Sequence, residues 1–428
     1  MLKKKNYELK DFYILWSTQS ISQLGSAITS FALTLWLYEK TNSALSTALL
    51  AICSYAPYVI VSIFAGALTD KLNKKRTMLV CDTIAAIGTL VIFIMLKMNI
   101  LQIWHLYIIN ALNGLMNTVQ QPASEVTMTL IIPKNLYQKT SGLISLSSSI
   151  ISILNPLIAT ALYSFGGINL VITVDLTSFM IAFLALLIFI KIPNARIESS
   201  KDFTTLIKEG LGFLKLNPMI LTLILFMAGV NLVASAFDAV LPAFVIPNPN
   251  GGTEILGIVT SCAGIAMVIG SIIVSFLPKP KDRVRIVYLT MLFALGIENF
   301  LLAFSKSPII WCLGQIVGWI LVPVMNANLN VIYRSTIPVE LQGRVYACRN
   351  SLQFFTIPLG LFLGGFMVDE IFEPLMSKVP NGSILTKLFG YGQSSGAAFV
   401  IFLLGIVGIL ICLLTGIKLK KYKFVENE

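Results

Sequence analysis

Long apolar runs recur along this chain of 428 residues and set the strongest limit on its fold. Each run reaches the roughly 20 residues that a helix needs to cross the hydrocarbon core of a bilayer. Backbone groups in lipid must be paired internally, which a helix achieves within each run. We therefore predict an all-α membrane protein with twelve transmembrane helices. Their predicted ranges are 12–37, 44–69, 77–97, 103–129, 138–164, 168–191, 218–245, 255–277, 285–305, 308–333, 343–369 and 396–418.

The composition and the charge distribution agree with this prediction. Hydrophobic residues make up 56% of the chain and charged residues 12%, whereas roughly a quarter of the residues of soluble domains are charged. The net charge of +11 does not indicate a nucleic-acid partner, because most cations fall in alternate connections, as in loops retained in the cytoplasm. Both termini are therefore predicted in the cytoplasm. Of the 31 Lys and Arg residues, five fall in segments predicted outside, the longest of which is 369–395: Lys40, Lys97, Lys306, Lys378 and Lys387.

A polar segment near the middle divides the chain into two halves. We predict an N-terminal six-helix half over residues 1–190, a cytoplasmic amphipathic linker over 191–217, and a C-terminal six-helix half with a cytoplasmic tail over 218–428. An Ile-Pro pair follows the fourth span at Pro133 and the tenth at Pro338. Because six is an even number of spans, both halves enter from the same side, so the two six-helix repeats are parallel.

The loop between the second and third spans resembles the signature loop of the major facilitator superfamily. That signature reads Gly-x-x-x-Asp-(Arg/Lys)-x-Gly-(Arg/Lys)-(Arg/Lys). The matching positions are Gly66, Asp70, Lys71, Lys74 and Lys75. Asn73 stands at the second glycine, and both residue types tolerate a left-handed turn. The resemblance covers nearly the whole chain and implies a transporter whose two halves surround a central cavity.

Other short motifs resemble the bacterial macrolide- and drug-efflux branch of this superfamily. They are Trp16-Ser-Thr-Gln19 with Gly25, Pro122-Ala123, Lys208-Glu209-Gly210 and Gly343-Arg344-Val345. Two features differ from that branch. Asn155, Ala159 and Thr160 stand where the antiporter motif of the fifth span has glycines, and the fourth span lacks the arginine of many drug/proton antiporters.

Charged residues around the signature loop predict a conformational latch at the cytoplasmic face. We expect Asp82 or Glu125 to pair with Lys75 or Arg76. We also expect Asp70 to face the start of the eleventh span, where free helix N–H groups favour an anion. The predicted latch residues are Gly66, Asp70, Lys71, Lys74, Lys75, Arg76, Asp82, Glu125, Gln342 and Arg344.

Polar side chains follow one face of the first, fourth, seventh and tenth spans. Such groups are costly in a membrane unless they face protein or a water-filled cavity. The four spans hold equivalent positions in the repeat, so a shared cavity is preferred over hydrogen bonding between packed helices. The predicted substrate-binding residues are Gln19, Gln23, Ser26, Asn113, Asn117, Gln121, Asn231, Asp238, Gln315, Trp319, Asn326 and Asn330. This largely neutral surface suits a bulky apolar or amphipathic molecule better than a phosphate or sugar acid.

Three acidic residues within the spans are candidates for proton coupling. Asp238 shares a helical face with Asn231 and is the first candidate, and Asp175 and Glu298 lie on the sixth and ninth spans. Burial favours the neutral form of a carboxyl group, which lets such a group load and release a proton as its exposure changes. Each could also be a hydrated or packing-paired acid without a role in coupling.

These patterns predict a proton-coupled secondary exporter of hydrophobic or amphipathic small molecules in the bacterial plasma membrane. We expect no cofactor, no nucleotide, no nucleic acid and no metal, and a monomer surrounded by lipid. Alternatives on the same fold are an exporter of siderophore-like metabolites and an importer of lipids or solutes. A membrane sensor without transport activity is the alternative from another class. An enzyme is not expected, because the acids are dispersed and the cysteines do not cluster.

Overall fold

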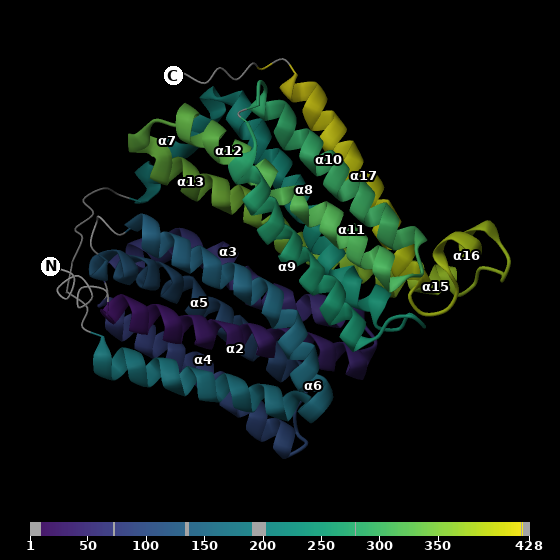
Figure 1. Ribbon diagram of the computed structural model, residues 1–428, viewed down its shortest axis with the longest axis horizontal. Helices are drawn as coiled ribbons and strands as arrows, with labels where there is room; N and C mark the ends of the chain where they lie inside the picture. Colours follow the sequence, from purple (N-terminus) through teal and green to yellow (C-terminus); the bar gives the residue numbers. More distant parts are fainter. Residues whose placement is uncertain are drawn as a thin grey trace. The chain divides into compact units, whose positions relative to one another are not determined.

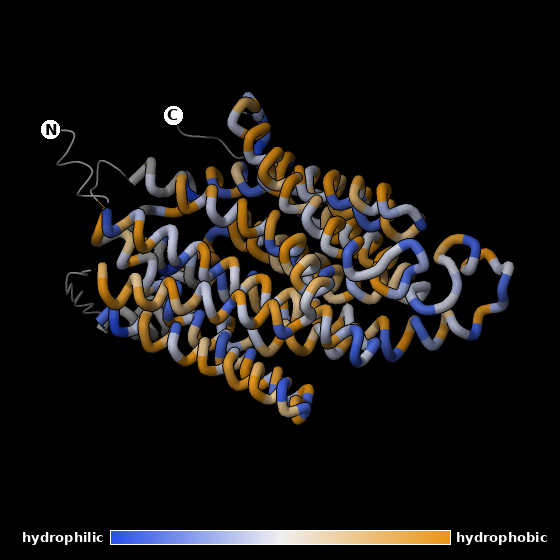
Figure 2. Tube along the Cα trace, turned by 60° about the horizontal axis from the view of Figure 1, so that its bottom comes forward, coloured by the Kyte–Doolittle hydropathy of each residue, from blue (hydrophilic) through white to orange (hydrophobic). Residues whose placement is uncertain are grey.

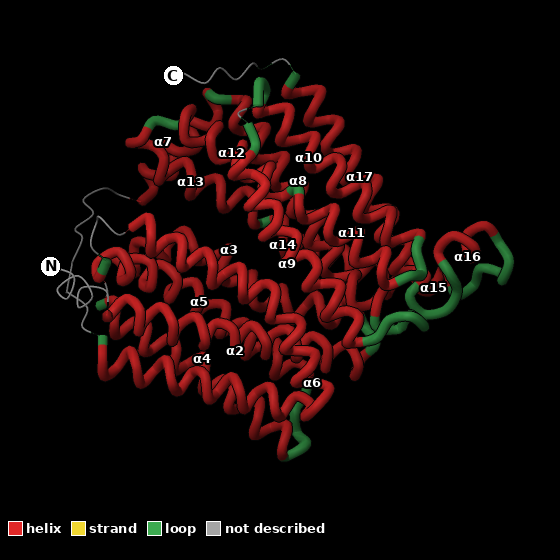
Figure 3. The backbone as a smooth tube through the Cα atoms, in the orientation of Figure 1, coloured by secondary structure: helices red, strands yellow, loops and turns green. Residues whose placement is uncertain are grey.

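The computed structural model describes residues 10–71, 73–132, 137–190, 203–278, 280–420 and 422. Within these ranges the regular secondary structure is helical, with no strand (Figure 3). The predicted all-α class is therefore confirmed. The chain divides into two compact units, Met1–Glu39 with Leu50–Ser200 and Lys40–Leu49 with Lys201–Glu428, which we call the first and the second unit.

The helices of the described ranges are labelled in Figure 1. The earlier part of the chain contains α2 (Lys10–Thr41), α3 (Ala44–Lys71), α4 (Lys74–Lys97), α5 (Ile103–Ile131) and α6 (Tyr137–Phe189). The later part contains α7 (Phe203–Leu216), α8 (Pro218–Val245), α9 (Thr253–Phe276), α10 (Arg283–Phe304), α11 (Pro308–Ile320), α12 (Val322–Thr336), α13 (Val339–Phe354), α14 (Thr356–Phe366), α15 (Glu373–Met376), α16 (Ile384–Phe389) and α17 (Ser395–Leu419).

Most of these helices have the length and composition of membrane spans. Nine helical stretches within the described residues are long and apolar enough to cross a bilayer. One of them, Leu143–Phe189, contains two predicted spans, because α6 turns at Gly167, where φ is 61°. Helices α2 and α5 lie outside that set but have 32 and 29 residues. In Figure 2 the orange of hydrophobic residues recurs along the length of the helices, with blue hydrophilic positions between.

The core of the first unit draws on all five of its helices. Ile28, Leu50, Ile92, Leu106 and Ile172 come from α2, α3, α4, α5 and α6 in turn, and all are buried in one cluster. Lipid tails are as apolar as these side chains, so close packing, more than exclusion of water, holds such helices together. Small residues permit that packing.

Gly114 on α5 lies very close to the backbone of α3. A Cβ atom added there would lie 2.1 Å from the carbonyl oxygen of Ser54 on α3. Real Cβ atoms do not approach an oxygen so closely. Only glycine therefore lets α3 and α5 pack at this distance.

In the second unit, α8 packs against α14 and α17, and α10 packs against α11 and α17. Two predicted spans are interrupted in this unit. The tenth breaks between α11 and α12 just before Pro323, and the eleventh breaks between α13 and α14 before Pro358. A proline inside a helix lacks the N–H donor and crowds the carbonyl four residues earlier, which accounts for breaks at these places.

The eleventh span continues further than its predicted end at residue 369. After α14, residues Met367–Phe372 form a π-helical turn and α15 extends the helix to Met376. The outside segment predicted over 369–395 therefore begins as helix and contains α16 as well. A turn with the wider π geometry changes the direction of its side chains, and such turns are frequent at functional sites.

Asp369, within the π-helical turn, caps the first turn of α3. Its Oδ2 atom accepts hydrogen bonds from the Ser43 hydroxyl (2.6 Å) and the Leu45 N–H (2.8 Å). Its Oδ1 atom accepts one from the Ala44 N–H (3.0 Å). The carboxylate thus satisfies two of the N–H groups that a helix leaves unpaired at its N-terminus and lies where the helix dipole favours an anion. The segment Lys40–Leu49, which contains the three donors, belongs to the second unit together with Asp369.

Candidate functional site

A cavity of about 980 Å³ lies within the first unit. Its walls come from α2, α4, α5 and α6, with Ser54 of α3. The volume suits an organic molecule of drug size, since binding pockets for such ligands span roughly 300–1,000 Å³. All six substrate-binding residues predicted in this unit line it: Gln19, Gln23, Ser26, Asn113, Asn117 and Gln121.

Helical periodicity explains why these polar groups share one cavity. Gln19, Gln23, Ser26 and Ser30 follow one another at intervals of three or four residues on α2. Asn110, Asn113, Asn117 and Gln121 repeat the pattern on α5. Residues at these intervals lie on one face of a helix. Apolar and aromatic residues also line the cavity, Trp16, Leu33, Ile92, Leu176 and Phe179 among them.

Two carboxyl groups also line the cavity. Asp175 on α6 is 5% exposed, and Ser26 donates a hydrogen bond of 3.1 Å to its Oδ1 atom. Asp82 on α4 accepts a hydrogen bond from the Gln120 amide. The sequence analysis predicted a proton-coupling role for Asp175 and a latch role for Asp82. It did not predict that the two acids line the same cavity. Their helical phase alone could have shown only that each faces inward.

Gly25 sets the distance between α2 and α6 beside Asp175. A Cβ atom at Gly25 would lie 2.3 Å from the Ser178 hydroxyl oxygen and 3.2 Å from the Asp175 Oδ1 atom. The absence of a side chain on α2 therefore leaves room for the carboxyl group on α6. This close packing is a structural reason for Gly25, the glycine that accompanies the Trp16-Ser-Thr-Gln19 motif.

The predicted binding residues of the second unit occupy α8, α11 and α12. The Asn231 amide donates to the Gln353 carbonyl oxygen at 3.1 Å. Gln315 is 2% exposed. Three further members are exposed, namely Asp238, Asn326 and Asn330.

Glu298 on α10 is buried among second-unit helices, with 7% exposure. Its carboxyl group interacts with the Trp319 indole and is near enough to Asp238 for the two acids to interact electrostatically. A Cβ atom added to Gly318 would lie 2.1 Å from the Glu298 Oε2 atom. The structure therefore groups two of the predicted coupling acids, Glu298 and Asp238, with a predicted binding residue, Trp319.

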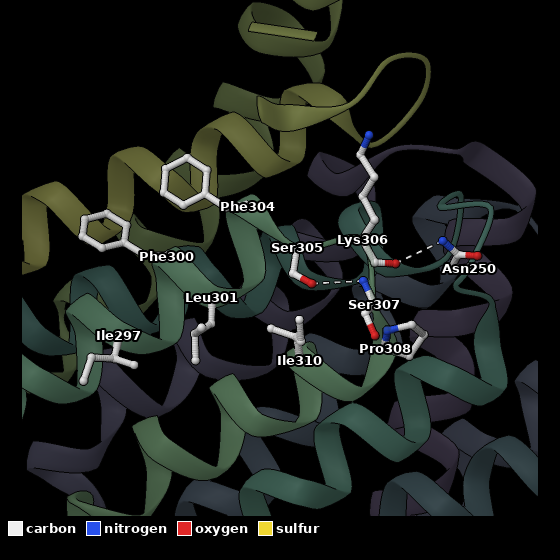
Figure 4. Close-up of a pocket in the computed structure, with 10 residues that line it drawn as sticks. All are labelled: Asn250, Ile297, Phe300, Leu301, Phe304, Ser305, Lys306, Ser307, Pro308 and Ile310. Atoms are coloured by element: carbon white, nitrogen blue, oxygen red, sulfur yellow. Dashed lines mark hydrogen bonds between the residues drawn. The ribbon is translucent and has the colours of Figure 1, made fainter. Parts of the chain in front are cut away.

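A second hollow of about 960 Å³ lies where α10 ends and α11 begins (Figure 4). Phe300, Phe304 and Ile310 give it an apolar surface. Its polar groups are engaged locally, since the Asn250 amide donates to the Lys306 carbonyl oxygen at 3.1 Å and the Ser307 N–H donates to the Ser305 hydroxyl at 3.0 Å. None of the described residues that line this hollow is an acid, so it lacks the carboxyl groups found in the first-unit cavity.

Comparison with known proteins decides the family. The sequence profile described as Major Facilitator Superfamily matches residues 15–361. The chain belongs to the Major Facilitator Superfamily. It is a multi-pass membrane transporter of that superfamily, and the resemblance noted in the signature loop is confirmed.

Named efflux proteins are among the relatives of this superfamily member. It is 26% identical over 378 residues to macrolide efflux protein A of Streptococcus pyogenes, covering 87% of this chain and 92% of the relative. It is 25% identical over 361 residues to the multidrug efflux pump Tap of Mycolicibacterium fortuitum, covering 81% and 86%. A solved bacterial homologue of the iron transporter ferroportin has the same fold, with a TM-score of 0.72, 14% identity and coverage of 97% and 99%.

The superfamily's signature loop is described only in part. The side chains of Gly66, Asp70, Lys71 and Glu125 lie outside the described residues. Lys74 is 3% exposed and Arg76 is exposed. The Lys75 ammonium donates to the carbonyl oxygens of Leu187 (3.0 Å) and Ile190 (2.7 Å). Among the described residues, the Lys75 ammonium therefore bonds to the end of α6. Asp82, which the sequence analysis named as a possible partner of Lys75, accepts a hydrogen bond from Gln120.

The two latch residues from the start of the eleventh span have partners within the second unit. The Gln342 amide donates to the Ile337 carbonyl oxygen at 3.1 Å. Arg344 forms an ion pair with Glu209 of α7. A Cβ atom at Gly210 would lie 2.8 Å from the Arg344 carbonyl oxygen. The Lys208-Glu209-Gly210 and Gly343-Arg344-Val345 motifs of this superfamily member therefore meet, which their separation in sequence did not reveal.

Proposed function

We propose that this superfamily member is a secondary active exporter of hydrophobic or amphipathic small organic molecules. The observation that carries the proposal is the first-unit cavity, whose volume of about 980 Å³ and mixed amide and apolar lining suit a bulky organic molecule. Two relatives, a macrolide efflux protein and a multidrug efflux pump, support the outward direction.

Coupling to proton entry belongs to the same proposal. Asp175 lines the cavity and is nearly buried, while Glu298 and Asp238 interact in the second unit. A buried carboxyl group is stable in its neutral form and takes up charge when water reaches it. Alternating exposure of such acids to the two sides of the membrane would carry a proton inward as a substrate molecule leaves.

Efflux measured in cells tests this function. A bacterial host without its own pumps is loaded with labelled erythromycin, a macrolide, and efflux is followed after energisation. We expect efflux with the wild type and its loss when an uncoupler collapses the proton gradient. Asp238→Asn should lose efflux at an unchanged membrane level.

The matched control is Glu254→Gln, which neutralises an exposed acid in the first turn of α9. This variant should retain efflux. A panel of dyes and other lipophilic compounds extends the test beyond macrolides. If the wild type exports no compound of the panel, or if efflux persists without a proton gradient, the proposed function is wrong.

A further inference from the structure

The hollow of about 960 Å³ where α10 ends and α11 begins lies in a surface that faces lipid. Ile297 and Phe304 line it, and both remain substantially exposed on α10, a helix long and apolar enough to span the membrane. Large apolar side chains exposed on a span are in contact with the bilayer. Because residues 305–307 connect two spans, the hollow lies where the hydrocarbon core meets the headgroups.

The hollow is elongated and has a charge at one end. From Ile297 to Phe304 it follows α10 for about two helical turns, roughly 10 Å. Lys306 is the one charged residue among the described residues that line it (Figure 4). Its side chain is exposed, and within the described part of the chain its ammonium group has no ion-pair or hydrogen-bond partner. The hollow therefore joins an apolar channel to an uncompensated cation.

Hydrogen bonds fix the end of the hollow at which this cation stands. The Asn250 amide donates to the Lys306 carbonyl oxygen at 3.1 Å, and the Ser307 N–H donates to the Ser305 hydroxyl at 3.0 Å. The indole of Trp311, which is fully buried, donates to the Ser305 carbonyl oxygen at 2.9 Å. The backbone that carries Lys306 is therefore held in place before any ligand arrives.

Aromatic packing keeps the side of the hollow open. The rings of Phe300 and Phe304 pack on Phe402 of α17, with centroids 5.7 and 5.4 Å apart, and Phe304 also packs on Phe389 of α16 at 5.6 Å. Rings engaged in this way do not turn inward to fill the space. An apolar hollow offers water few hydrogen-bond partners, so it favours an apolar occupant.

We propose that this hollow binds one phospholipid with an anionic headgroup. An acyl chain lies along α10 from Phe304 towards Ile297, and the phosphate pairs with the Lys306 ammonium. A phospholipid matches both features in their observed order, because its tails lie in the hydrocarbon core and its phosphate at the membrane surface. The inference goes beyond the proposed function and does not depend on it.

The charge of Lys306 decides which lipid is preferred. Leaving the bilayer for the hollow gives an acyl chain no hydrophobic gain, since lipid tails are as apolar as the protein surface. The acyl chain therefore fills the space without selecting a headgroup. A lysine near the membrane surface attracts anionic lipids, and its contribution corresponds to roughly fivefold in affinity.

Two lipids with identical acyl chains test the proposal. The full chain in detergent is titrated with phosphatidylglycerol, which is anionic, and with phosphatidylcholine, which is zwitterionic, and bound lipid is counted by native mass spectrometry. Lys306→Gln removes the charge and Lys306→Arg retains it. The matched control is Lys97→Gln, at an exposed lysine in the last turn of α4.

We expect the wild type, Lys306→Arg and Lys97→Gln to bind phosphatidylglycerol roughly fivefold more tightly than phosphatidylcholine. In Lys306→Gln the two lipids should bind equally. Equal binding of the two lipids by the wild type, a preference that survives in Lys306→Gln, or a preference lost equally in Lys97→Gln would each overturn the inference.

A second pair of variants tests the acyl-chain part of the site. Ile297→Trp places a larger side chain in the hollow and should weaken binding of both lipids by roughly fivefold or more. Ile309→Trp adds the same bulk at an exposed residue of α11 that is not among the described residues lining the hollow, and should bind both lipids as the wild type does. Unchanged binding in Ile297→Trp would contradict the proposed site.

Photocrosslinking locates the bound lipid. Phosphatidylglycerol with a photoreactive group in its acyl chain should label peptides that contain residues 297–310. Unlabelled phosphatidylglycerol should compete with this labelling, and inorganic phosphate should not. Labelling confined to other spans, or displacement by inorganic phosphate alone, would show that the hollow does not hold a phospholipid.

Discussion

The carboxylate of Asp369 gives the sharpest test of a local structure in this protein. Three donors converge on it: the Ser43 hydroxyl and the N–H groups of Ala44 and Leu45, at 2.6 to 3.0 Å. In Asp369→Asn one oxygen becomes an NH₂ group, which cannot accept, so at least one backbone N–H at the start of α3 loses its partner. The negative charge that complements the helix dipole is lost as well.

The size of the effect follows from these contacts. A hydrogen bond to a charged group contributes about 1.5–3 kcal/mol and the charge at the helix end about 0.3–1 kcal/mol. Asp369 is only half-buried, so water compensates part of the loss. We expect the free energy of opening the first turn of α3 to fall by about 2 kcal/mol, which corresponds to roughly 30-fold faster amide exchange.

Hydrogen–deuterium exchange on peptides that cover residues 40–49 measures this opening. Glu370→Gln is the matched control, because Glu370 is the next residue in the same π-helical turn and is exposed. Exchange should accelerate in Asp369→Asn, accelerate further in Asp369→Ala and stay unchanged in Glu370→Gln. Unchanged exchange in both Asp369 variants, or equal acceleration in the control, would refute the reasoning.

Three further predictions concern packing, an ion pair and transport. Gly114→Ala should lower thermal stability in detergent by several degrees, because the added Cβ meets the Ser54 carbonyl oxygen at 2.1 Å; an unchanged melting curve would contradict this backbone contact. Glu209→Gln should weaken docking of α7 by about 1 kcal/mol or less, because its pair with Arg344 is partly exposed; a double-mutant cycle measured by limited proteolysis would show no coupling if the pair were absent. Asp175→Asn should lose erythromycin efflux at normal expression, because this buried acid of the first-unit cavity is a coupling residue in the proposed function; efflux equal to that of the wild type would exclude it from coupling.

Much of the fold could be predicted from the sequence, because span length and hydropathy are local properties. The predicted seventh span, 218–245, agrees with α8 at both ends, and the predicted connection after residue 164 falls near the turn of α6 at Gly167. The extent of the eleventh span could not be predicted. Its outer end continues through a π-helical turn whose Asp369 finds its partners more than 320 residues earlier in the chain.

The polar stripes of the candidate site could be predicted from the sequence, but the two acids in its wall could not. Helical phase places Gln19 and Asn113 on inward faces, and both line the cavity. Phase does not tell which faces meet, so the approach of Asp82 on α4 and Asp175 on α6 to one cavity required the three-dimensional structure. The site as predicted was therefore largely neutral, with Asp238 as its acid, whereas the first-unit cavity in the structure contains two other acids, Asp82 and Asp175.

Transport by the purified protein tests the central claim most directly. The full chain is reconstituted into liposomes that contain a pH-sensitive dye, a pH gradient is imposed in the absence of nucleotide, and movement of labelled erythromycin and of tetraphenylphosphonium is followed together with the internal pH. A secondary exporter should move at least one of these compounds against its concentration gradient, with proton flow in the opposite direction, and an ionophore that collapses the gradient should abolish both movements. Proton flow that does not depend on either compound, or compound movement that does not depend on the gradient, would contradict the account.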